Sequence, residues 1–169
     1  YDVVLCDVWG VLHNGHAPWA SAAEALIRFR AGGGTVILVS NAPRRVRDVE
    51  DQLAGIGVPE GVCDGIITSG VVTRHEIDRR GVRFVHHVGA DRDVGLFEGL
   101  ELVEPNEAQL AVVTGLEDDL TQVPEDYRTR LITMQAQGLD LIFANPDRVV
   151  ERGDQLVWCA GALADLYEK

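Results

Sequence analysis

Two polar segments follow buried strands that the sequence predicts, and both carry residue types that could act on an anion. Asp7 closes the predicted strand 3–7, and Ser40 and Asn41 follow the predicted strand 35–39. A carboxylate in such a place can attack a substrate, and a short hydroxyl can donate a hydrogen bond to an anion. Two structural alternatives stay open: Asp7 as an acid that caps its own loop, and Ser40 as an ordinary helix N-cap.

Buried strands that alternate with helices predict how these residues are positioned. The apolar runs 3–7, 35–39 and 65–68 are predicted strands, and each is followed by a helix-like pattern. This β-α-β-α-β-α order favours an α/β fold with a parallel sheet and helices on both faces. Because ligands bind at the carboxyl ends of such strands, we expect Asp7 and Ser40 to lie at one functional edge of the sheet.

Local signals indicate where these helices begin and end. Ser21 with Glu24 fits the capping box of a first helix, which the glycines 32–34 end. The segment 40–43 is predicted to open a second helix, with a proline near its first turn. A third helix is expected to begin near Ser69.

The pattern restarts after Gly81 with shorter elements. We interpret residues 1–80 as a core, residues 81–145 as an inserted α+β domain and residues 146–169 as the return to an incomplete core. The elements expected in the last two parts are strands 82–88, 108–114 and 139–144 and helices 92–99, 124–137 and 160–169.

Composition and charge exclude several classes of protein. Lys and Arg number 15 against 27 Asp and Glu, which gives a net charge of −12. An acidic chain repels phosphate backbones, so no nucleic-acid partner is expected, and no apolar run is long enough for a membrane helix. The three cysteines lie far apart without a Cys-x-x-Cys pair, which favours a reduced, cytoplasmic setting. The densest positive patch is the cluster Arg44, Arg45 and Arg47, and a homo-oligomer is left open.

Three segments together resemble a known family. The stretch Leu-Cys-Asp-Val-Trp-Gly-Val-Leu-His-Asn-Gly at 5–15 resembles the first motif of the haloacid dehalogenase superfamily, and Val-Ser-Asn-Ala-Pro-Arg at 39–44 resembles its second motif. Phe-Ala-Asn-Pro-Asp at 143–147 resembles the segment that ends the C2-type cap in the class IIA branch, which includes nitrophenyl-phosphate, pyridoxal-phosphate and sugar-phosphate phosphatases. The resemblance implies a Rossmann-like core with a C2-type cap at 81–145.

The resemblance also implies a reaction, the hydrolysis of a small phosphorylated metabolite through an aspartyl-phosphate. Asp7 would be the nucleophile, and Ser40 and Asn41 would bind and orient the phosphoryl group. Magnesium would be held by the Asp7 carboxylate and the backbone carbonyl of Trp9. It would offset a repulsion of about 4 kcal/mol for each pair of unit charges about 4 Å apart. Further candidate substrate contacts are Arg44, Asn145 and Asp147.

The sequence departs from the family pattern two residues after the expected nucleophile. Phosphatases of this superfamily carry a second aspartate there as general acid and base, and this chain has Trp9. A missing general acid typically lowers a rate by roughly 10²–10⁴-fold. Two alternatives therefore stand beside the phosphatase: a changed, dehalogenase-like reaction whose leaving group needs no proton, and a catalytically silent binding or regulatory module.

A second departure concerns the end of the chain. The third motif, a lysine in a Gly-Lys-Pro context, and the fourth, an acid pair after a later strand, are absent from the sequence, and Lys169 stands in a different context. We therefore expect these residues to be part of a longer protein with further core strands.

Overall fold

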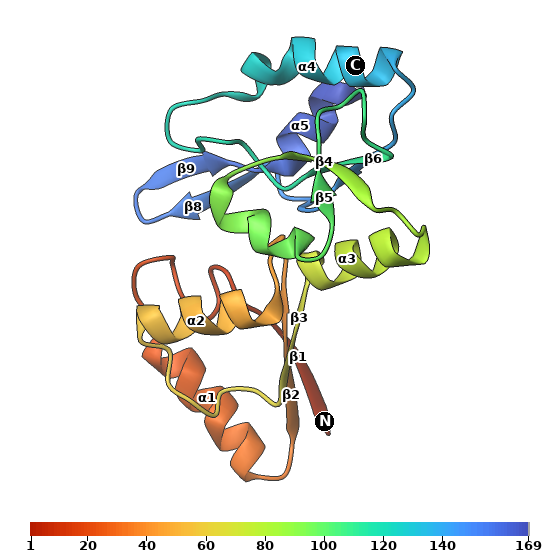
Figure 1. The fold of residues 1–169 in the computed structure, drawn as a ribbon. Helices are drawn as coiled ribbons and strands as arrows, with labels where there is room; N and C mark the ends of the chain where they lie inside the picture. The colour runs from red at the N-terminus through yellow and green to blue at the C-terminus, as the bar shows by residue number, and fades with distance from the viewer. Residues whose placement is uncertain (169) are drawn as a thin grey trace. The chain divides into compact units, whose positions relative to one another are not determined.

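The structure, a computed structural model, describes residues 1–168, and residue contacts divide it into two units (Figure 1). The first unit holds residues 1–40, 45–68 and 151–155, and the second holds 41–44, 69–150 and the residues from Leu156 onward. Each unit has a parallel sheet, so the expected α/β class is confirmed. The division into core, insertion and return segment stays a prediction. In the described chain, no helix is long and apolar enough to cross a membrane.

Three apolar segments form the sheet of the first unit. β1 (Val3–Asp7), β2 (Thr35–Ser40) and β3 (Gly65–Thr68) run parallel in the order β1-β2-β3. Asp7 pairs with Val39 and Ser40 pairs with Thr68, so the strands end at one common edge. The strands predicted from the sequence are confirmed, with only the end of β2 displaced by one residue.

The helices α1 (Ala20–Ala31) and α2 (Val46–Ile56) lie on one face of this sheet (Figure 1). Val36 of β2 is fully buried, whereas Leu5 of β1 is 70% exposed and Val39 is exposed as well. The expectation of helices on both faces is therefore wrong for the described part of this unit. Its helices cover one side of the sheet and leave apolar side chains exposed on the other.

The predicted capping of α1 is also wrong. The helix begins at Ala20, and its N-cap residue Trp19 makes no side-chain capping bond, so Ser21 lies inside the first turn. The Trp19 amide instead donates to the carbonyl of Leu12 over 2.8 Å, and its carbonyl accepts amides of the first turn. Backbone contacts thus fix this helix start, which a side-chain pattern does not reveal.

The second unit is built on a four-stranded parallel sheet in the order β5-β4-β6-β7. Its strands are β4 (Phe84–Val88), β5 (Glu101–Leu102), β6 (Leu110–Val113) and β7 (Leu141–Phe143). Its helices are α3 (Ser69–Arg79), the 3-10 helices η1 (Asp91–Phe97) and η2 (Pro124–Tyr127), α4 (Arg128–Ala136) and α5 (Ala160–Tyr167). The predicted helix 124–137 thus opens as a 3-10 turn. The predicted helix 160–169 is confirmed as far as Tyr167, and Lys169 lies outside the described residues.

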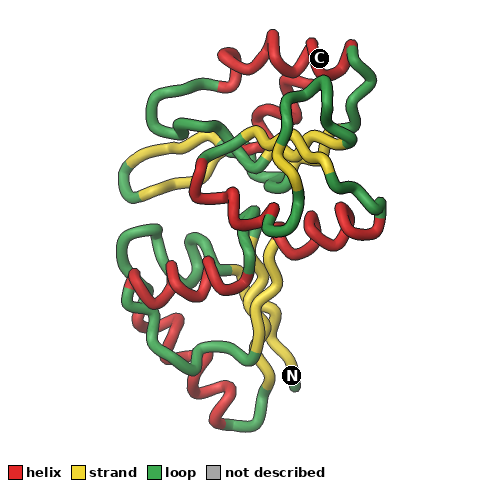
Figure 2. The backbone as a smooth tube through the Cα atoms, in the orientation of Figure 1, coloured by secondary structure: helices red, strands yellow, loops and turns green. Residues whose placement is uncertain are grey.

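One pair of strands was not predicted from the sequence. β8 (Val149–Arg152) and β9 (Gln155–Trp158) form a two-stranded sheet, drawn in yellow with a green turn in Figure 2. Gly153 in this turn has a φ of 60°, a left-handed conformation that glycine adopts without strain. Each strand has only four residues, too few for an alternating pattern to stand out. The tip of the pair, 151–155, belongs to the first unit.

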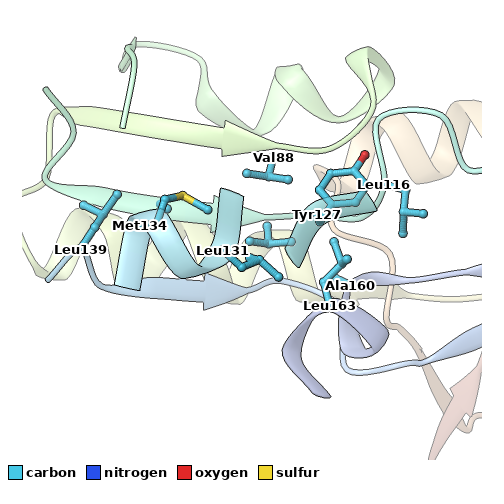
Figure 3. Packing of buried hydrophobic residues seen from close by; sticks show 10 residues of the cluster. Val88, Leu116, Tyr127, Leu131, Met134, Leu139, Ala160 and Leu163 are labelled. Carbon is cyan, nitrogen blue, oxygen red and sulfur yellow. The ribbon is translucent and has the colours of Figure 1, made fainter. Parts of the chain in front are cut away.

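A buried apolar cluster joins the sheet of the second unit to its helices. Figure 3 shows Leu131 and Met134 of α4 beside the strands, with Leu163 of α5 and Tyr127 of η2 in the same cluster. Leu131 and Met134 are three residues apart, so they share one face of α4. This packing orders the helices that have few side-chain caps of their own.

Replacing Leu131 with alanine should lower the free energy of unfolding by about 2–5 kcal/mol, because it leaves a cavity where the side chain is only 1% exposed. The matched control is Ile132→Ala on the same helix, whose side chain is 55% exposed; it should change the free energy by about 0.5 kcal/mol or less. Urea unfolding followed by circular dichroism measures both. Equal losses for the two variants would contradict the packing described for α4.

Candidate active site

Asp7 stands at the carboxyl end of β1, where the chain leaves the sheet. Its side chain is exposed, and its Oδ1 accepts the amide hydrogen of Val8 over 2.7 Å. This bond orients the carboxylate without burying it. Asp7 is therefore placed as a nucleophile or cation ligand must be, fixed in direction and open to a reactant.

Ser40 and Thr68 end the two neighbouring strands at the same edge, and both side chains are buried. Side chains alternate along a strand, and Asp7 is paired with Val39. The strand pattern thus assigns Ser40 to the helix-covered face and Asp7 to the opposite one. The expected common edge is confirmed. That Asp7 and Ser40 lie on opposite faces of the sheet was not predicted.

Trp9 is fastened to a segment far away in the sequence. Its indole Nε1 donates to the carbonyl oxygen of Glu151 over 2.7 Å. Gly15 lies against the ring, since a Cβ there would stand 3.0 Å from two indole carbons. The amide of Gly153 donates to the carbonyl of Asn14 over 3.3 Å. The loop after β1 and the tip of the β8–β9 pair therefore form one bonded assembly within the first unit.

His13 completes this assembly from inside. It is 1% exposed, and its ring meets the Trp9 ring edge-on, with 5.0 Å between centroids. Its Nδ1 accepts the amide hydrogen of Gly15 over 2.9 Å, so in the neutral ring the hydrogen is on Nε2. Burial lowers the pKa of His13, and the negative charge of Asp7 acts against that shift. His13, a residue of the segment 5–15, is thus a core residue in the structure.

The remaining predicted site residues belong to the second unit. Asn41 donates from Nδ2 to both carboxylate oxygens of Asp147, over 3.1 and 3.2 Å. The amide of Asp147 donates to Oδ1 of the buried Asn145 over 2.9 Å. The structure thus brings together three predicted residues, of which Asn41 lies 106 positions before Asp147. The carbonyl of Asp147 also accepts the amide hydrogen of Gly161 at the start of α5 over 2.9 Å.

The segment 40–43 does not open a helix, which corrects the prediction. The amide of Gly70 in α3 donates to the carbonyl of Ala42 over 3.2 Å, and the chain bends at Pro43 and Arg44 before Arg45, the N-cap residue of α2. A Cβ at Gly70 would lie 2.3 Å from the carbonyl oxygen of Arg44. Only glycine allows this close approach, which holds the segment beside α3.

The arginine cluster consists of paired rather than free charges. Arg44 donates from Nε to Oδ1 of the buried Asp93 over 3.0 Å, and Arg45 makes an ion pair with Asp48. Arg47 also lies within 3.8 Å of Asp48. Asp93 lies far in the sequence from each of the three family-like segments, and its pairing with Arg44 was not predicted. The role of Arg44 as a substrate contact stays a prediction.

The donors expected for magnesium form a small set. Among residues 1–168, no three side chains of His, Cys, Asp or Glu gather into a metal site. The candidates are the Asp7 carboxylate and the Trp9 carbonyl. Mg²⁺ binds proteins through one or two carboxylates, with water and substrate phosphate filling the other positions. A single exposed carboxylate with a backbone oxygen two residues later in the sequence is compatible with this coordination.

A recess of about 1000 Å³ opens in the second unit beyond the ends of β4 and β6. In its wall, His86 has Nδ1 2.8 Å from the carbonyl of Val103 and Nε2 2.9 Å from a guanidinium nitrogen of Arg130. Arg130 is also paired with Glu117. His86, Arg130 and Glu117 are thus hydrogen-bonded or ion-paired with one another or with backbone in the wall of the recess.

Comparisons with known proteins agree on one family. The model of a family described as haloacid dehalogenase-like hydrolase matches residues 4–103. Haloacid dehalogenase-like hydrolase domain-containing protein 2 of Rattus norvegicus is 31% identical over 98% of this chain and 61% of its own length. A haloacid dehalogenase-like hydrolase from Brucella suis 1330 is 48% identical with a TM-score of 0.93, over 99% of this chain and 65% of that one.

A more distant solved structure shares the fold alone. The p-nitrophenyl phosphatase from Archaeoglobus fulgidus is 24% identical with a TM-score of 0.76, over 98% of this chain and 63% of that one. The chain thus spans less than two thirds of the length of each of these relatives.

Replacing Trp9 with phenylalanine should loosen the assembly of loop and strand tip. The variant keeps an aromatic ring but removes the N–H that the Glu151 carbonyl accepts, which should lower the free energy of unfolding by about 0.5–1.5 kcal/mol. The amide of Gly153 should also exchange its hydrogen faster. Urea unfolding and hydrogen exchange by mass spectrometry measure these changes. Trp19→Phe, at an exposed tryptophan, is the control, and an equal effect of both variants would refute the indole bond.

Proposed function

Because the chain belongs to the haloacid dehalogenase-like hydrolase family, we propose that it acts as a phosphatase of a small phosphorylated metabolite. Asp7 attacks the phosphorus, forms an aspartyl-phosphate and is released when water attacks the same phosphorus. The observation that carries this proposal is the exposed, oriented Asp7 carboxylate at the edge where β1, β2 and β3 end.

The neighbouring residues would bind the phosphoryl group. Ser40, at the end of β2, would donate its hydroxyl hydrogen to a phosphoryl oxygen, and Asn41 would orient the substrate. Arg44, Asn145 and Asp147 would contact the rest of the substrate. The bonds of Asn41 to Asp147 and of Asp147 to Asn145 support this grouping, since they hold the three side chains in one polar cluster.

We propose Mg²⁺ as the cofactor, with the Asp7 carboxylate and the Trp9 carbonyl as its protein ligands. When bound, the ion would supply positive charge that offsets the repulsion between the attacking carboxylate and the phosphate. The indole bond to Glu151 supports this role for Trp9, because a fixed side chain also restricts the backbone that carries the carbonyl.

We propose that residues 81–145 form a C2-type cap that selects the substrate and excludes water during the reaction. Their four-stranded parallel sheet lies wholly within this range and supports a domain of its own, and the apolar clusters on it also include Ile77, Ala160 and Leu163. A cytoplasmic location is proposed from the free cysteines Cys6, Cys63 and Cys159. We propose a small phosphorylated metabolite as the partner and expect no nucleic-acid or membrane partner. Whether the protein forms a homo-oligomer is left open.

Trp9 favours a second candidate function on the same scaffold. A reaction such as dehalogenation releases an anion that needs no proton, and an indole bonded to a carbonyl oxygen cannot donate one in catalysis. A silent binding or regulatory module is the third candidate. Halide release would support the second candidate, and binding of metal or phosphate without any turnover would support the third.

Replacing Asp7 with asparagine should abolish phosphate release, because an amide cannot form the acyl-phosphate. The assay is release of inorganic phosphate by the full-length protein from a panel of phosphate esters and anhydrides, with and without Mg²⁺. The control is Asp2→Asn, which removes an exposed carboxylate just before β1. Magnesium-dependent release that survives in Asp7→Asn would overturn the proposed nucleophile.

A further inference from the structure

Trp9, two residues after the proposed nucleophile, has a side chain that bonds the loop to a distant segment. Trp9 donates its indole N–H to the Glu151 carbonyl over 2.7 Å, and its ring meets the His13 ring edge-on and lies against Gly15. An indole N–H is not an acid at physiological pH, and this one already has an acceptor. Trp9 therefore has neither the chemistry nor the freedom to protonate a departing oxygen.

The rest of the loop offers no carboxylic acid. From Val8 to Ala23, the sequence contains no Asp or Glu, and its titratable side chains are His13 and His16. His13 is buried and uses Nδ1 to accept the Gly15 amide hydrogen. His16 lies beside the turn of the β8–β9 pair, where a Cβ on Gly153 would stand 2.7 Å from its Nε2. The His13 ring is thus part of the packing of this loop, whereas the His16 side chain is exposed.

Transfer of a phosphoryl group to Asp7 makes a bond from the carboxylate oxygen to phosphorus and breaks the bond from phosphorus to the leaving oxygen. The leaving oxygen keeps the electron pair of the broken bond. An alkoxide is a strong base and needs a proton as it departs, whereas a carboxylate is stable as an anion at neutral pH. A site with tryptophan at this position and no carboxylic acid on this loop is therefore suited to the second kind of leaving group.

We infer that the substrates of this site are acyl phosphates, mixed anhydrides of a carboxylic acid and phosphoric acid, rather than phosphate esters of alcohols. This inference rests on the proposed function, because it requires Asp7 to be the nucleophile. The leaving carboxylate departs with its electron pair and takes no proton.

The second half of the reaction obeys the same rule. The phosphorylated Asp7 is itself an acyl phosphate, so attack of water on its phosphorus expels the Asp7 carboxylate, again a stable anion. The proton that water loses passes to the solvent or to the released phosphate. Both halves then run without a general acid, and water is the only co-reactant.

The test is a comparison of leaving groups with the full-length protein and Mg²⁺. Phosphate release is measured as kcat/KM for acetyl phosphate, 4-nitrophenyl phosphate, phenyl phosphate and glycerol 3-phosphate. We expect acetyl phosphate and 4-nitrophenyl phosphate to react, and phenyl phosphate to be slower than 4-nitrophenyl phosphate by roughly 10²-fold or more, the usual size of a missing acid. Glycerol 3-phosphate should be slower still.

Trp9→Asp makes the comparison specific to this residue. A carboxyl group at this position should raise kcat/KM for phenyl phosphate relative to 4-nitrophenyl phosphate, which flattens the dependence on the leaving group. The matched control is Trp19→Asp, which introduces the same charge at an exposed N-cap where aspartate is well tolerated; it should keep the steep dependence. Should Trp9→Asp fail to fold, the series on the unmodified protein and on Trp9→Phe decides alone.

The outcomes separate this inference from the proposed function. Glycerol 3-phosphate turned over as fast as acetyl phosphate, with release lost in Asp7→Asn, would overturn the inference and leave the phosphatase standing. No release from any of the four compounds by a folded protein would overturn the phosphatase itself, and the inference with it.

Discussion

The parallel register of β1 against β2 is the constraint on which the proposed chemistry depends. It pairs Asp7 with Val39 and ends the two strands within one residue of each other. A shift of a single residue would move Asp7 to the other face of the sheet, because side chains alternate along a strand. The buried apolar residues of β2 beneath α1 and α2 keep this register, so packing far from Asp7 determines where its carboxylate is presented.

Trp9 links that edge to a distant part of the chain. Its indole N–H donates to the carbonyl of Glu151, 142 positions later. In the same loop, the carbonyl of Asn14 accepts the amide hydrogen of Gly153. Where a proton donor would need an aspartate, this chain has a tryptophan whose indole bond holds the loop in place. This exchange would account for both the bonded loop that follows Asp7 and the proposed preference for leaving groups that depart as anions.

Much of this arrangement could be predicted from local sequence. The apolar runs gave β1, β2 and β3 almost to the residue, and the alternation with helices gave the parallel sheet. Two of the failures are long-range. The start of α2 depends on Ala42 meeting Gly70, and the environment of Trp9 depends on Glu151. Such contacts join residues whose spacing carries no periodic signal, so neither pattern nor propensity reveals them.

The proposed mechanism requires that Asp7 is phosphorylated during turnover. The most direct measurement is to quench the full-length protein with acid while it hydrolyses acetyl phosphate, digest it, and map the phosphoryl group by mass spectrometry. We expect an acyl-phosphate, labile to hydroxylamine, on the peptide that contains Asp7. Rapid turnover with that peptide unmodified, or with the phosphoryl group on another residue, would contradict it.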